Sequence, residues 1–217
     1  MTPAGGIDFE TLVKKYRWPS HTNDSRASVR LNMAVDAAGE SIDPAGSSTG
    51  LSFTEDRQLL KAIRFDADAV VVGASTVRAE GWNLPPTGVL VVLSKSGNLP
   101  WATCPERERV RVISQSDSMR SIVSSLEEQG MFNILVEGGV SIARLFAQEN
   151  LFDEVCLTVS LGDANAEATV AVSRALEKLL AVDSQSFERV SLVPAVTVHA
   201  VFTLWRRALN SPPLTAH

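Results

Sequence analysis

Three stretches of the chain end in residues that could bind an anion. Each stretch is a short apolar run, typical of a buried strand, and each is followed by glycine, hydroxyl or charged side chains at Gly73–Thr76, Ser94–Lys95 and Glu137–Ser141. A helical pattern begins after the first and third runs. A helix start leaves backbone N–H groups unpaired and carries a partial positive charge, and glycine lets a phosphate approach the backbone. These residues favour a dinucleotide phosphate site, although an ordinary turn that needs glycine only for a positive φ would give the same pattern.

The usual nucleotide fingerprints are missing from the sequence. Neither G-x-G-x-x-G nor G-x-x-x-x-G-K-[ST] occurs, so the chain has no standard dinucleotide or triphosphate loop. In an open parallel sheet, however, ligands lie beyond the carboxyl ends of the strands. We therefore expect the three turns to share one cleft, in which two helix starts, a hydroxyl and an ammonium group face a phosphate-bearing dinucleotide.

The elements that must position these turns alternate between strands and helices. Strands are expected at 29–36, 69–73, 89–93, 110–113, 133–136 and 154–161, and helices at 54–64, 74–80, 119–128 and from 142 onward. Thr54 is the expected N-cap of the helix at 54–64. An acidic, alanine-rich connection is expected after residue 161. A closing antiparallel hairpin is expected at 187–193 and 196–204.

This alternation predicts a single α/β domain with a largely parallel sheet. We place the domain at 29–207, after an N-terminal extension and linker at 1–28 and before a tail at 208–217. The loop at 37–50 is rich in glycine, serine and proline. Structureless loops of this length are uncommon in compact domains unless they bind something, so a functional role is expected for it.

The overall composition narrows the class of function. A net charge of −5, a pI of about 5.3 and the lack of a long basic run argue against nucleic-acid binding and favour small ligands. No apolar run approaches the roughly 18 to 20 residues of a membrane span, and Asp8 and Glu10 stand where a signal peptide would be apolar, so a cytoplasmic protein is expected. Cys104 and Cys156 lack CxxC spacing and a nearby histidine, which predicts free thiols and no metal site.

Three segments in order resemble a known family. They are similar to the reductase domain of riboflavin biosynthesis, the RibD C-terminal domain. The segments read MAVDAAG, then EDRQLLKAIRFDADAVVVGASTVRAEG, then ILVEGGVSIARLFAQENLFDEVCLTVS. That domain forms the C-terminal half of a bifunctional deaminase-reductase, and the likeness covers about residues 29 to 205. It implies a dihydrofolate reductase-like, three-layer α/β fold with a central, mostly parallel mixed sheet and a C-terminal antiparallel hairpin.

The resemblance also implies an activity and a cofactor. The expected reaction is an NADPH-dependent reduction of a pyrimidine ribosyl-phosphate by hydride transfer to an open-chain imine, without a metal. Lys95 beside Ser94 could favour the 2′-phosphate of NADPH, or it could be a solvated surface lysine. The implied cofactor contacts are Asn32, Met33, Ala34, Gly73, Ala74, Thr76, Glu80, Ser94, Lys95, Gly138, Gly139, Val140, Ser141 and Ile142.

The implied substrate contacts are Ser48, Arg64, Leu84 and Glu137, and Asp36 is the candidate for assisting proton delivery. Two turns depart from the family pattern. AVDAAG stands where the family has S-L-D-G, and TVRA continues with EGWNLPPTG where the family has D-D-P-x-L-T-V-R. Thr87 therefore occupies the position of a substrate-clamping arginine, which puts the phosphorylated pyrimidine in doubt. Trp82 offers a flat surface for stacking a ring, or it belongs to the core.

Alternatives remain open at this point. A reductase acting on a pterin or folate would share the fold, and a non-catalytic NADPH-binding protein would explain the altered turns. No H-x-E or P-C-x-x-C motif occurs to hold a deaminase zinc, so reduction alone is expected. Family members are commonly homodimers, and the apolar alternation at 196–205 could form an interface strand or be buried within the monomer.

Overall fold

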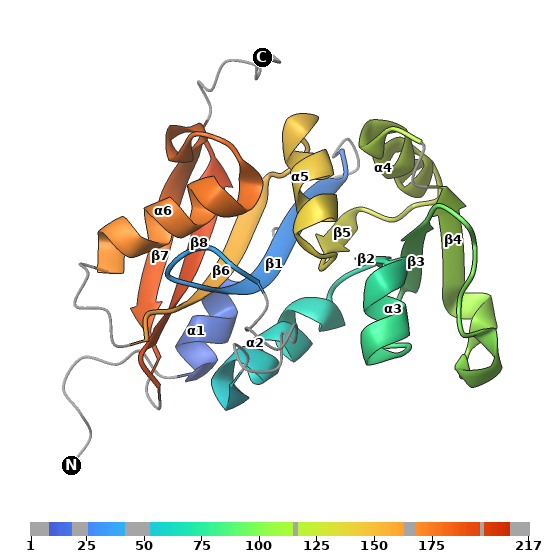
Figure 1. The fold of residues 1–217 in the computed structure, drawn as a ribbon, viewed down its shortest axis with the longest axis horizontal. Coiled ribbons are helices and arrows are strands. Elements are labelled where there is room, and N and C mark those ends of the chain that lie inside the picture. The colour runs from blue at the N-terminus through green and yellow to red at the C-terminus, as the bar shows by residue number, and fades with distance from the viewer. Residues whose placement is uncertain are drawn as a thin grey trace.

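The fold was analysed in a computed structural model that describes residues 9–18, 26–41, 53–114, 117–162, 168–195 and 198–208. Its strands form one eight-stranded sheet in the order β4-β3-β2-β5-β1-β6-β8-β7 among these residues (Figure 1). The strands are β1 Ser28–Asp36, β2 Ala69–Gly73, β3 Val89–Ser94, β4 Val110–Ser114, β5 Asn133–Val136, β6 Glu154–Ser160, β7 Phe187–Pro194 and β8 Ala200–Arg207. The α-helices are α1 Phe9–Lys15, α2 Thr54–Phe65, α3 Ala74–Glu80, α4 Met119–Glu128, α5 Val140–Gln148 and α6 Ala168–Leu180, and short 3₁₀ turns lie at Trp101–Thr103, Arg107–Arg109 and Ser184–Ser186.

The sheet is mixed in the way the sequence predicted. The six strands from β4 to β6 in this order run parallel to their neighbours, while β8 pairs antiparallel with β6 and β7 antiparallel with β8. Every residue of β2 is apolar or glycine because both faces of this strand are covered by the core. Ala69 and Val71 belong to the core on one face, whereas Val70 and Val72 belong to the core on the other.

Helices cover both faces of the sheet and make the predicted three layers. α4, α5 and α6 pack on one face, and α1, α2 and α3 lie on the other (Figure 1). The two faces have separate hydrophobic clusters, which meet only across the strands. This arrangement places α2 and α3 on the same side of the sheet, next to the carboxyl ends of β2 and β5.

Three sequence predictions need correction. The stretch after 161 contains the helix α6, whose buried Ala171, Val172, Ala175, Leu176, Leu179 and Leu180 recur at helical spacing; alanine is a strong helix former and was misinterpreted as part of a connection. Helix α2 begins at Thr54 itself, and Phe53 is its N-cap residue without a side-chain cap bond. β8 begins at Ala200, because Val198 and His199 form a bend before it.

The apolar alternation of the last strand is explained within the monomer. β8 lies between β6 and β7, and its residues from Ala200 to Trp205 are all buried. Val201 and Trp205 belong to the core on one face of the sheet, and Phe202 and Leu204 belong to the core on the other, so the apolar side chains are explained without any partner chain. The predicted homodimer therefore gains no support from this strand and stays a prediction.

The described part of the N-terminal segment is bound to the sheet by a buried polar cluster. The Trp18 indole donates a hydrogen bond of 3.0 Å to the Ile63 carbonyl at the end of α2. The fully buried Arg30 on β1 stacks on the Trp18 ring at 4.1 Å, pairs with Glu154 and donates to the Tyr16 carbonyl at 2.6 Å. A buried guanidinium needs these partners, since an unpaired one would be strongly destabilising.

Three structural observations concern the sequence predictions on membrane spans, metal sites and cysteines. No helix in the described ranges is both long and apolar enough to cross a membrane. The same ranges contain no group of three or more histidine, cysteine, aspartate or glutamate side chains that could hold a metal ion. Both cysteines are free thiols, and burial raises the pKa of the Cys156 thiol to about 12.

Candidate functional site

The three turns singled out in the sequence lie side by side. β3, β2 and β5 are neighbours in the sheet, so their carboxyl ends meet at one edge. Gly73 at the end of β2 lies opposite Leu93, one residue before Ser94. The backbone N–H of Glu137 donates to the Val71 carbonyl at 2.9 Å, which attaches the third turn to the same place. The three turns are therefore neighbours at one edge of the sheet, and the cleft expected between them stays a prediction.

The glycines in the turn after β5 are not explained by a positive φ, which is the usual reason for glycine in a turn. Neither Gly138 nor Gly139 has a positive φ, and the φ of Gly139 is −57°. A Cβ on Gly138 would lie 2.8 Å from the Cβ of Ile142, so this glycine lets α5 pack closely against the turn. A Cβ on Gly139 would meet nothing within 4 Å. The fold itself therefore requires glycine at 138 but not at 139.

The start of α5 presents unpaired donors. The backbone N–H groups from Gly138 to Ser141 have no acceptor within the described ranges, and the first helical bonds run from Ile142 and Ala143 to the Gly139 carbonyl. Gly139 and Ser141 are exposed. This combination of open backbone donors and a helix start suits an anion.

The turn after β3 is held by its own serine. Ser94 is buried, and its hydroxyl oxygen accepts a hydrogen bond of 3.0 Å from the Gly97 N–H. Lys95 is exposed and makes no ion pair with a described residue. Ser94 therefore shapes the loop that carries Lys95, and the ammonium group is available to solvent.

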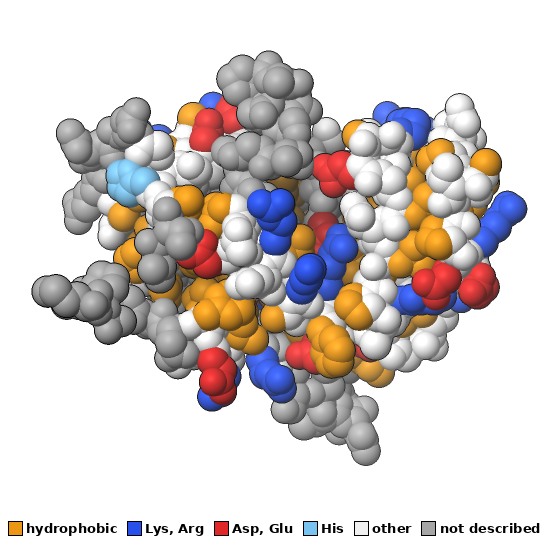
Figure 2. Space-filling view, turned by 90° about the horizontal axis from the view of Figure 1, so that it is seen from below, with side chains coloured by type: hydrophobic (Ala, Val, Ile, Leu, Met, Phe, Trp, Pro, Cys, Tyr) orange, Lys and Arg blue, Asp and Glu red, His pale blue; other side chains and the backbone are white. Residues whose placement is uncertain are grey.

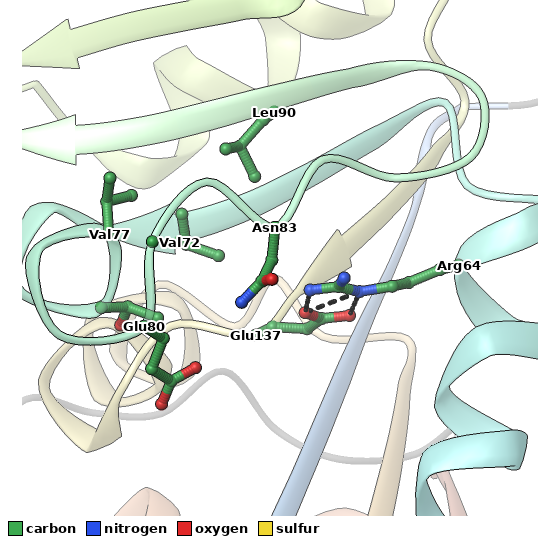
Figure 3. Close-up of a pocket in the computed structure, with 9 residues that line it drawn as sticks. Arg64, Val72, Val77, Glu80, Asn83, Leu90 and Glu137 are labelled. Carbon is green, nitrogen blue, oxygen red and sulfur yellow. Dashed lines mark hydrogen bonds and ion pairs between the residues drawn. The ribbon is translucent and has the colours of Figure 1, made fainter. Parts of the chain in front are cut away.

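Two predicted substrate residues contact each other directly. Arg64, in the last turn of α2, donates from Nε to both carboxylate oxygens of Glu137, at 2.8 and 3.0 Å, and its Nη2 donates to the same carboxylate (Figure 3). Their side chains keep only 17% and 10% of their exposure. Burial alone would lower the pKa of Arg64, but the hydrogen bonds and charge of Glu137, together with the charge of Glu80, raise it above its ordinary value.

This ion pair forms one wall of a pocket between α2, α3 and the sheet (Figure 3). The pocket brings predicted cofactor residues Thr76 and Glu80 together with predicted substrate residues Arg64 and Glu137. Its lining is Arg64, Val72, Thr76, Val77, Glu80, Gly81, Asn83, Leu90 and Glu137. Asn83 also lines the pocket and was not predicted, because no motif marks it in the turn between Trp82 and Leu84.

Several predicted contacts lie elsewhere. Leu84 and Trp82 pack against the core on the α2 side, and Trp82 stacks on Trp101 at 5.0 Å while donating to the Pro100 carbonyl at 3.1 Å. The Thr87 hydroxyl donates to the Phe65 carbonyl at 2.9 Å. Leu84 and Thr87 are not part of the pocket lining, and Ser48 falls outside the described residues.

Asp36 stabilises the turn that follows β1. Its Oδ1 accepts hydrogen bonds from the N–H groups of Ala38 at 2.8 Å and Glu40 at 2.9 Å. Gly39 has a φ of +78°, and Glu40 pairs with Lys178 on α6 at 2.7 Å. Asp36 thus has a structural task, and its proton-delivery role stays a prediction. The expected cofactor contacts Asn32, Met33 and Ala34 precede it on β1, which lies between β5 and β6.

Comparison with protein families identifies the domain. A family model described as the RibD C-terminal domain matches residues 27–171, about two thirds of the chain. The chain belongs to the RibD C-terminal domain family. Comparison with the sequences of curated proteins gives no significant match.

Three solved structures share the fold of this member of the RibD C-terminal family. A pyrimidine reductase-like protein from Corynebacterium diphtheriae is 18% identical, with a TM-score of 0.67 over 85% of this chain and 93% of that one. A deaminase/5-amino-6-(5-phosphoribosylamino)uracil reductase from Thermotoga maritima is 21% identical, with a TM-score of 0.64 over 84% of this chain and 57% of that one. Dihydrofolate reductase from Enterococcus faecalis, complexed with NADP(H), is 16% identical, with a TM-score of 0.58 over 83% of this chain and 96% of that one. The chain therefore spans little more than half of the bifunctional relative.

Proposed function

We propose that this chain is a reductase that uses NADPH to reduce a nitrogen-containing ring substrate of the pyrimidine type by hydride transfer. The observation that carries the proposal is the adjacency of two different surfaces at one sheet edge. One is the open helix start at Gly138–Ser141, which suits a phosphate, and the other is the pocket with the Arg64–Glu137 pair. Membership of the family supports the reaction type.

The residues at the cofactor side fit a nicotinamide dinucleotide. The unpaired N–H groups at the start of α5 would hold a phosphate, and Gly139 leaves its backbone open to close approach. The exposed Lys95 would meet the 2′-phosphate that distinguishes NADPH from NADH. When bound, the cofactor supplies the hydride, and the protein supplies binding, orientation and electrostatics.

At the substrate side, the ion pair offers a donor beside an acceptor. Arg64 uses Nε and Nη2 toward Glu137, while its Nη1 has no acceptor among the described residues. Oε1 of Glu137 accepts from Arg64 Nε only and retains a further lone pair for a substrate N–H, whereas Oε2 already accepts from both Nε and Nη2. A donor next to an acceptor is complementary to a ring carbonyl next to an N–H, which is the edge that a pyrimidine imide presents.

The experiment has two stages. Titration with NADPH, followed by calorimetry or by quenching of tryptophan fluorescence, is expected to give saturable binding, and its absence would refute the proposal. Oxidation of NADPH is then followed with the pyrimidine ribosylamine, with and without its phosphate, and with dihydrofolate. Turnover of dihydrofolate alone would identify a folate reductase, and turnover of none of them would identify a cofactor-binding protein.

A further inference from the structure

Asn83 is a polar residue of the substrate pocket to which the sequence motifs assign no role. It lies in the loop after α3 and stands at the position marked x in the family's D-D-P-x-L-T-V-R. Its side chain is exposed, and the amide makes no hydrogen bond with a described residue. Only its backbone N–H is bonded, to the Gly81 carbonyl at 3.2 Å. The amide therefore has no task in the described fold, although it carries two donor hydrogens and an acceptor oxygen.

The loop that carries Asn83 is fixed on both sides of it. Gly81 has a φ of +83°, and its N–H closes the last turn of α3. Trp82 stacks on Trp101 with 5.0 Å between the ring centroids, and Leu84 packs against the core on the α2 side. Since both neighbours are held, the backbone of Asn83 has little freedom to lose when its amide binds a ligand.

The amide faces the ion pair across the pocket. Figure 3 shows the end of the Asn83 side chain directed toward Arg64 and Glu137. That pair keeps one donor, Nη1 of Arg64, without an acceptor among the described residues, and one oxygen, Oε1 of Glu137, with a further lone pair. Val72 and Leu90 give the same pocket an apolar surface for a ring. A ring placed here meets a fixed donor, a fixed acceptor and an amide that serves as either.

These three groups match three adjacent positions of a pyrimidine ring. The Oε1 atom of Glu137 suits the N–H at ring position 3. The guanidinium of Arg64 can only donate, so it suits the carbonyl at position 4. The amide of Asn83 is left for position 2, where it can donate to a carbonyl or, turned over, accept from an amino group.

We propose that Asn83 is a specificity-determining residue that hydrogen-bonds the group at position 2 of the substrate ring. This inference rests on the proposed reductase function and specifies how the same pocket distinguishes its substrates. A carboxylate in place of the amide could only accept a hydrogen bond. It would keep a ring with an amino group at position 2 and reject one with a carbonyl, because two acceptors would then face each other without a proton.

The test uses two pyrimidines that differ at ring position 2. 5-Amino-6-ribitylaminouracil has a carbonyl there, and 2,5-diamino-6-ribitylamino-4-pyrimidinone has an amino group. Calorimetry with saturating NADPH and without it gives the dissociation constant of each compound for the wild type, Asn83→Ala and Asn83→Asp. The measurements are made at about pH 8, where an aspartate side chain is ionised.

The two variants are expected to differ in kind. Asn83→Ala should weaken both compounds about fivefold, as the loss of a neutral hydrogen bond would. Asn83→Asp should shift the ratio of the two dissociation constants about tenfold or more toward the amino compound. Asn98→Asp makes the same change at an exposed residue outside the pocket lining and should keep the wild-type ratio. Both Asn83 variants should keep the wild-type melting temperature, since the amide has no partner in the described fold.

Several outcomes overturn the inference. Wild-type affinities in Asn83→Ala would show that the amide does not touch the ring. An unchanged ratio in Asn83→Asp would show that residue 83 does not select the group at position 2. Binding of neither compound to the wild type would show that the pocket does not recognise an aminopyrimidine. Failure of the reductase proposal is seen separately, as the absence of NADPH binding in a titration without pyrimidine.

Discussion

The two adjacent glycines after β5 should respond in opposite ways to the same substitution. A Cβ on Gly138 would lie 2.8 Å from Cβ of Ile142 and 2.9 Å from both its Cγ2 and Cδ1. Optimal carbon–carbon separations are about 3.5 to 4.0 Å, so Gly138→Ala must displace α5 or its side chain. A Cβ on Gly139 has open space around it, and its φ of −57° suits alanine.

The expected magnitudes follow from this geometry. Overpacking of this kind costs about 1 to 3 kcal/mol, so Gly138→Ala should lower the melting temperature by about 4 to 8 °C for a cost of about 2 kcal/mol in a chain of this size. Gly139→Ala should leave the free energy of unfolding unchanged or raise it by up to about 1 kcal/mol, because alanine restricts the unfolded chain. The measurement is thermal and urea unfolding of both variants without ligand.

The two substitutions should also differ in their effect on NADPH binding. If the start of α5 holds a cofactor phosphate, the methyl group of Gly139→Ala blocks the approach to the backbone, and the NADPH dissociation constant should rise about tenfold or more while stability is kept. Gly139→Ala with unchanged NADPH affinity would refute the phosphate assignment. Gly138→Ala with wild-type stability would refute the packing argument, since the crowding of Ile142 would then cost nothing.

Three further predictions follow from the site and the core. Glu137→Gln leaves Arg64 partly buried beside a neutral partner, so urea unfolding should show a loss of about 2 kcal/mol, less than for a fully buried pair because both side chains keep some exposure. Lys95→Ala should weaken NADPH binding about tenfold and leave NADH binding unchanged, and equal effects on the two cofactors would assign Lys95 to the surface alone. Burial raises the pKa of Cys156 from 9.0 to about 12 and also raises that of Tyr16, so the unfolded chain releases these protons first and stability should fall as the pH rises from about 9 toward 12. Cys156→Ala should flatten that part of the pH profile, and an unchanged slope would contradict the assignment.

Much of the framework is a local property of the sequence. The apolar run from Ala69 to Val72 must be covered on both faces, and this is sufficient to predict a central parallel strand. The glycine turn at Gly138 and Gly139 marks a strand-to-helix junction because turn chemistry involves only near neighbours. Segments with a strong period, such as Met119–Glu128 and Asn133–Val136, agree with the structure at both ends. The alanine-rich α6 was missed because its buried face depends on a sheet that the local sequence does not reveal.

The pairing within the site was decided only by the tertiary structure. Arg64 and Glu137 are 73 residues apart, and their contact depends on β5 lying beside β2 rather than on anything near either residue. Counting along the loop placed Thr87 where an arginine binds substrate, yet the chain carries it to the Phe65 carbonyl, and Asn83 lines the pocket instead. The sequence alone predicted that the three turns lie at the same edge of the sheet, because the carboxyl ends of parallel strands share that edge. Which side chains face one another across that edge depends on the sheet order and the path of the loops, and both are set by packing between distant segments.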